Sequence, residues 1–151
     1  MGFCLLIGDV ERARATLERG KQAGAALDDL VYAALWLTML EEQLGAGSEG
    51  SARAIFDQAA SSKHWIGALA SWGLGKIGDG ELSTAAQSPS NKIEANFYVA
   101  MRARAKGKDP SVDALTAVAK SGLFDRVEVD VARELTAPPV RVVLPKGIHL
   151  P

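Results

Sequence analysis

Glycines between residues 73 and 78 have the spacing of a phosphate-binding loop. The stretch reads Gly-Leu-Gly-Lys-Ile-Gly, which matches G-x-G-x-x-G. In a dinucleotide site such glycines follow a strand and open a helix, so that free backbone amides meet the pyrophosphate. Here they follow a predicted helix over residues 65–77 and end it. The pattern therefore favours small residues at a helix contact and a helix C-terminus over a nucleotide site.

Few residues could ligate a metal or act as a catalytic base. The histidines are His64 and His149, and the single cysteine is Cys4. These three residues lack the close spacing of zinc ligands, and one cysteine cannot form an internal disulfide. No Ser-His-Asp order stands out either. We therefore predict that the chain is not an enzyme and uses no metal or cofactor.

A basic run covers the end of a predicted helix over residues 91–106 and the turn after it. Arg102 and Lys106 share one face of this helix, and Arg104 and Lys108 share another. Cations near a helix C-terminus interact favourably with the helix dipole, so a solvated face is the simpler interpretation. The alternative is a site for an anion or a protein partner, and Arg102 is our candidate for that contact.

Large aromatic side chains are the other candidates for a binding surface, because Trp and Tyr are enriched in interface hot spots. In a chain with 6% aromatic residues they are also the natural core of small, Ala-rich helices. Both interpretations stay open. We predict that Phe97 is buried together with Met101, four residues later, and that Tyr98 lies in a groove and contacts a partner. Trp36 is the second candidate for partner binding.

Helices are the elements expected to position these residues. Hydrophobic residues make up 48% of the chain and are mostly Ala and Leu, which favour helices over strands. The predicted helices cover residues 28–44, 65–77, 91–106 and 123–135, and shorter helices follow turns within 8–20, 51–59 and 81–87. The helix over 123–135 could also be a strand, because Val127, Val129 and Val131 alternate.

A turn followed by a helix with small, large and small residues at i, i+4 and i+7 recurs along the chain. The copies are Ala13, Leu17 and Gly20; Ala52, Phe56 and Ala59; and Ala114, Val118 and Ser121. Glycines at positions 8, 47, 78 and 107 are 39, 31 and 29 residues apart. These intervals bracket the ~34-residue period of helix-turn-helix repeats.

In this pattern and in its Gly8-Asp9 turn, the chain resembles the tetratricopeptide repeat (TPR) family over roughly residues 1–122. The third pair departs from the family pattern, because its second helix, near residues 81–87, is short. The resemblance implies an all-α fold over residues 1–137, an α-solenoid of about three TPR-like helix-turn-helix pairs. It also implies a protein–protein interaction module, a scaffold or adaptor that binds a protein or peptide partner in a concave helical groove.

Residues 138–151 predict a short extended tail, because no helix interior tolerates their prolines, Pro138, Pro139, Pro145 and Pro151. The segment at one end is Pro-rich and the segment at the other is apolar, whereas the ends of a repeat array usually carry polar caps. This difference indicates an alternative function. The chain would then be the C-terminal structural module of a larger protein, packing on its own neighbouring domain or subunit.

Net charge and hydropathy argue against two further classes of function, nucleic-acid binding and membrane insertion. The formal net charge of −1 gives no electrostatic case for nucleic acid, whose binding depends on neutralising phosphates. No apolar run is long enough to insert into a membrane. A single cysteine favours the cytoplasm, and a periplasmic location stays open for a chain that is part of a longer exported protein. The sequence does not fix the oligomeric state.

Overall fold

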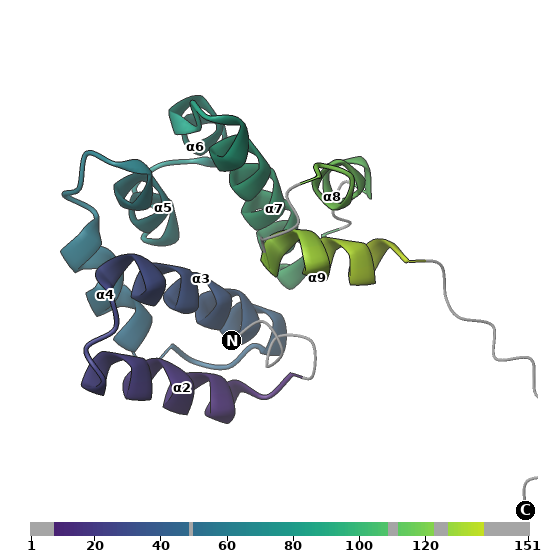
Figure 1. Ribbon diagram of the computed structural model, residues 1–151. Coiled ribbons are helices and arrows are strands. Elements are labelled where there is room, and N and C mark those ends of the chain that lie inside the picture. Colours follow the sequence, from purple (N-terminus) through teal and green to yellow (C-terminus); the bar gives the residue numbers. More distant parts are fainter. Residues whose placement is uncertain (1–7, 49, 109–111, 123–126, 138–151) are drawn as a thin grey trace, which may run out of the picture.

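The computed structural model describes residues 8–48, 50–108, 112–122 and 127–137, and this part of the chain holds helices and no strand (Figure 1). In chain order these are α2 (Val10–Gln22), α3 (Leu27–Leu44), α4 (Ser51–Ala59), α5 (Trp65–Gly73), α6 (Asp79–Ala85), α7 (Pro89–Ala105), α8 (Val112–Ala119) and α9 (Val127–Thr136). The all-α prediction is confirmed. The predicted tail over 138–151 lies outside the described residues. No described helix is both long and apolar enough to cross a membrane.

Two helices begin at side-chain caps. Asp9 precedes α2, and its Oδ1 accepts a hydrogen bond of 2.9 Å from the backbone N–H of Arg12. Ser88 precedes α7, and its Oγ accepts a hydrogen bond of 3.0 Å from the backbone N–H of Asn91. Pro89 then takes the first helical position, where its missing N–H leaves no hydrogen bond unmade. Each cap satisfies a backbone donor that the first helical turn leaves open.

Helix α3 begins without a side-chain cap. Its N-cap is Ala26, and the nearby Asp28 and Asp29 do not cap the helix. Both carboxylates lie in the first turn instead, where they interact favourably with the helix dipole. At the other end the helix stops as predicted at Gly45, whose φ of 62° lies in the left-handed region that favours glycine.

One further helix has a different end from the predicted one, and for another segment the structure decides between helix and strand. Helix α5 ends at Gly73, four residues before the predicted end at 77, because Gly75 turns the chain with a φ of +71°. The segment that could have been a strand is helix α9. Its buried residues Val129 and Ala132 are three apart on one helical face, and helical spacing therefore fits the buried side better than strand alternation does.

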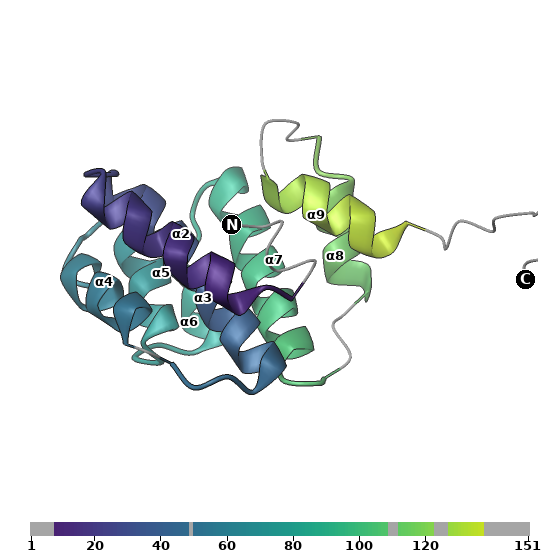
Figure 2. The same cartoon turned by 90° about the horizontal axis from the view of Figure 1, so that it is seen from below.

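Helices α3 and α7 carry most of the packing. Consecutive helices contact one another from α2 to α7 and from α7 to α9, and further contacts join α3 to α5, α3 to α7 and α7 to α9. In Figures 1 and 2, α2 and α4 lie against α3, while α8 and α9 lie together at one end of α7. The direct α3–α7 contact links the two halves of the described chain.

Aromatic rings fill the contact between α3 and α7. The ring of Trp36 lies 5.4 Å from that of Phe97, and the ring of Tyr98 lies 5.3 Å from Phe97, measured between centroids. Tyr32 stacks on Tyr98 at 6.4 Å. Tilted and edge-on pairs at these separations add to the apolar burial. The large side chains that the sequence offered as binding candidates are therefore mostly used to join these two helices.

Candidate functional site

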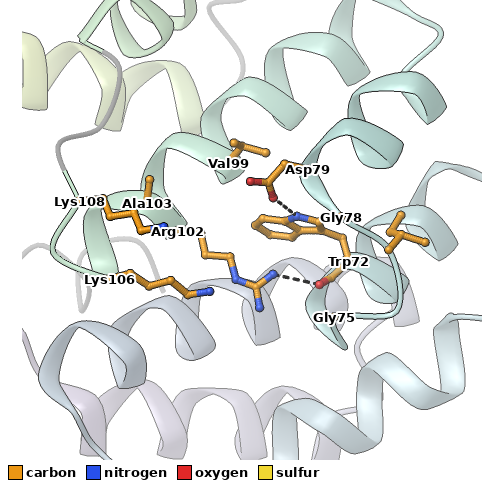
Figure 3. A pocket seen from close by; sticks show the side chains of 10 residues that line it. Trp72, Gly75, Gly78, Asp79, Val99, Arg102, Ala103, Lys106 and Lys108 are labelled. Carbon is orange, nitrogen blue, oxygen red and sulfur yellow. Dashed lines mark hydrogen bonds between the residues drawn. The ribbon is translucent and has the colours of Figure 1, made fainter.

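A pocket of about 340 Å³ lies between the C-terminal half of α7 and the segment that connects α5 to α6 (Figure 3). Helix α7 contributes one wall, and the turn after α5 contributes the other. We call it the basic pocket and define it by the residues Trp72, Asp79, Val99, Arg102, Lys106 and Lys108. Its volume is at the small end of the range for ligand sites, roughly 300–1,000 Å³.

Trp72 forms the aromatic side of the basic pocket. Its side chain is almost fully buried, and its Nε1 donates a hydrogen bond of 2.8 Å to Oδ1 of Asp79 in the first turn of α6. This bond satisfies the indole N–H, which usually finds a partner when a Trp is buried. It also fixes the ring against the start of the next helix, so the pocket has one rigid aromatic face.

Arg102 is held over this ring. Its guanidinium carbon lies 4.5 Å from the centroid of Trp72, and its Nη1 donates a hydrogen bond of 3.0 Å to the Trp72 carbonyl oxygen. Its Nη2 lies 3.7 Å from Oε1 of Glu42 near the end of α3. The side chain is 19% exposed. A cation over an aromatic face, fixed by a second contact, is orientated before any ligand arrives.

Lys106 and Lys108 complete the basic side of the pocket, and both side chains are exposed. Among the residues that the structure describes, neither lysine forms an ion pair or a side-chain hydrogen bond. Glu42 partly neutralises the charge of Arg102, whereas no carboxylate among the described residues neutralises the ammonium groups of Lys106 and Lys108. The pocket therefore presents two unneutralised cations beside a fixed guanidinium.

The glycine pattern at 73–78 builds one wall of this pocket and follows a helix, where a nucleotide loop would follow a strand. Gly73 lies against Phe56, since an added Cβ would come within 2.8 Å of the ring. Gly75 takes the left-handed turn after α5, and the backbone N–H of Gly78 donates a hydrogen bond of 2.8 Å to Glu81 at the start of α6. The glycines follow a helix, as predicted, and serve a helix contact and a helix end.

Of the three residues predicted to bind a partner, Arg102 alone lines this pocket. Trp36 is 3% exposed and packs on Phe97. Tyr98 is 0% exposed, so the prediction that its ring lies in an open groove is wrong. The physical reason is that Tyr32 and Trp36 on α3 pack on its ring, while Glu128 on α9 accepts a hydrogen bond of 2.7 Å from its hydroxyl. The predicted burial of Phe97 is confirmed.

Three glutamates are buried in the described part of the chain, and the sequence did not indicate this. Glu41 on α3 lies 3.0 Å from Nη2 of Arg14 on α2. Glu94 on α7 accepts hydrogen bonds on Oε2 from the Tyr32 hydroxyl at 2.8 Å and from Trp65 Nε1 at 2.7 Å. Glu128 on α9 is held by Tyr98. Burial raises the pKa of the Tyr98 phenol well above its usual range, and the neighbouring Glu128 carboxylate adds to this rise. Glu94 and Glu128 join α3, α5, α7 and α9 in the interior.

The residues weighed as metal ligands do not come together in the described part of the chain. His64 is the exposed N-cap of α5. Cys4 and His149 lie outside the described residues. Among the described residues, no group of three His, Cys, Asp or Glu side chains is placed to hold a metal ion.

Comparison of the chain with protein-family models, with curated proteins and with solved structures finds no match. The resemblance to the TPR family therefore stays a prediction. We argue the function from the chain's own residues, above all from the basic pocket.

Proposed function

We propose that this chain is a protein–protein interaction module and that the basic pocket is part of its contact surface. One observation carries the proposal: Arg102 is fixed over Trp72 at 4.5 Å, next to two exposed lysines without a carboxylate partner among the described residues. Arg and Trp are enriched at interface hot spots, where a rigid anchor loses little entropy on binding. A fixed Arg–Trp stack at a surface pocket has this character.

The proposed architecture is a short array of helix pairs, α3–α4, α5–α6 and α7–α8, in which each first helix contacts its own second helix. In an extended solenoid each repeat contacts only its neighbours. Here α3 of the α3–α4 pair also contacts α7 of the α7–α8 pair. We therefore propose a compact array, with the α3–α7 contact filled by aromatic rings and the partner site on the outer side of α7.

Position-specific photocrosslinking tests the proposed function. A photoreactive amino acid replaces Lys106 in the basic pocket, and in a matched control it replaces Lys120, an exposed lysine after α8 that does not line the pocket. Each variant is irradiated in native cell extract. We expect a discrete protein adduct from position 106 and none from position 120. Equal labelling at both positions, or none at 106, would contradict a role for the pocket.

A further inference from the structure

The charges around the basic pocket are unevenly distributed. Lys106 and Lys108 stand on the α7 side, and the carboxylate of Asp79 on the opposite side is engaged by the Trp72 indole at 2.8 Å (Figure 3). The other nearby carboxylate, Glu42, lies 3.7 Å from Arg102. Each of these carboxylates thus has one oxygen in contact with Trp72 or Arg102, whereas both lysines have no carboxylate partner among the described residues.

The uncharged lining of the pocket adds a second requirement. Val99 and Ala103 on α7, Ile77 on the connecting segment and Trp72 all line the pocket. These groups offer contact to a small apolar side chain but no further charge. A ligand that fits both parts carries carboxylates for the lysines and an apolar group beside them. An extended acidic peptide meets both requirements.

The chain's own terminal segments lack that chemistry. Residues 138–151 contain no Asp or Glu and carry the cations Arg141 and Lys146, and residues 1–7 contain no charged side chain. Like charges repel, so the segment 138–151 is a poor occupant for a site rimmed by lysines. An acidic occupant has to be supplied by a different segment or another molecule.

We propose that the basic pocket binds an acidic segment of a protein partner, with its carboxylates on Lys106 and Lys108 and an apolar side chain against the apolar lining of Val99 and Ile77. This inference rests on the proposed function and names the chemistry of its partner. Exposed charges of this kind act within a Debye length, about 8 Å at physiological ionic strength, so binding weakens as salt is added.

Selection from a random peptide library tests the proposal. A phage-displayed library of random dodecapeptides is selected on the immobilised full chain at low salt, and enriched peptides are resynthesised for fluorescence polarisation. We expect enrichment of peptides that contain several Asp or Glu residues and an apolar residue. Enrichment of neutral or basic peptides, or no enrichment, would overturn the proposal. The same holds if citrate at millimolar concentration displaces the peptides fully, since the pocket would then be a small-anion site.

Matched variants locate the binding. Lys106→Gln with Lys108→Gln should weaken binding of the selected peptides about tenfold, since each exposed ion pair contributes only a few-fold in affinity. Lys63→Gln with Lys120→Gln changes the net charge equally at exposed positions outside the basic pocket and should leave binding unchanged. Equal losses in both double variants would overturn the assignment. If position 106 still crosslinks a partner while selection yields no acidic peptide, the proposed function stands and its acidic chemistry is wrong.

Discussion

The hydrogen bond between Tyr98 and Glu128 should be a strong contributor to stability, and Tyr98→Phe isolates it. This change keeps the ring, which is fully buried, and removes the hydroxyl that donates to Glu128 at 2.7 Å. Glu128 is 4% exposed, and no other hydrogen bond to its side chain comes from the described residues. The carboxyl group would lose its protein donor while the cavity around the ring stays filled.

The expected loss follows from the kind of bond. A hydrogen bond to a charged group contributes about 1.5–3 kcal/mol, so Tyr98→Phe should lower the free energy of unfolding by about 2 kcal/mol. Tyr32→Phe is the matched control, since it removes a hydroxyl from Glu94 but leaves the Trp65 donor at 2.7 Å on the same oxygen. We expect this control to cost less than about 1 kcal/mol.

A double-mutant cycle separates the bond from other effects of the substitution. Urea unfolding, followed by far-ultraviolet circular dichroism at neutral pH, is measured for Tyr98→Phe, Glu128→Leu and the double variant. We expect a coupling energy of about 1.5 kcal/mol or more between the two positions. A coupling near zero, or a loss below about 0.5 kcal/mol in Tyr98→Phe, would show that this hydrogen bond does not hold α9 against α7.

Three further predictions concern the core and the pH dependence. Phe56→Ala should lower the free energy of unfolding in urea by about 3–5 kcal/mol, since the ring is 2% exposed; a loss under about 1 kcal/mol would refute its burial. Gly67→Ala should cost roughly 1–3 kcal/mol, because its Cβ would collide with the backbone oxygen of Ser62. The control Gly80→Ala, with no atom within 4 Å of the new Cβ, should cost nothing. Because burial raises the pKa of Tyr98 in the fold, its stabilising effect should be complete below pH about 10 and decline as pH rises above that value. Urea unfolding at several alkaline pH values should show a decline that is steeper in the wild type than in Tyr98→Phe, and parallel curves would contradict the cause given.

Sequence patterns predicted a helix well where all the residues that define it lie within that helix. The repeat of small, large and small residues placed a helix at 51–59, and α4 covers Ser51–Ala59. Asp9 caps the start of α2, and Gly45 ends α3, as their residue types suggest. The end of α5 is predicted four residues too late, at residue 77, because the glycines after it also suit a helix end. The left-handed turn lies at Gly75 instead.

The candidate site could be predicted only in part, because its contacts cross between helices. Arg102 stood out in the basic run, but its stacking partner Trp72 is 30 residues earlier on another helix. The buried Glu94 and Glu128 gave no signal, since a charged residue in a helix is normally exposed. Tyr98 was predicted on the wrong surface because its contacts come from distant parts of the chain. Tyr32 on α3 stacks on its ring, and Glu128 on α9 binds its hydroxyl.

The two faces of α7 make binding and stability separable. Phe97, Tyr98 and Met101 form the face that packs into the interior. Val99 and Lys106 lie seven residues apart, on a different face that lines the basic pocket. A change at Lys106 removes charge from solvent-exposed surface and leaves the packed face intact, so it should alter partner binding with little effect on unfolding. Changes on the packed face should do the reverse. A partner surface on this chain is therefore expected along the pocket side of α7, where Arg102 already stands fixed on Trp72.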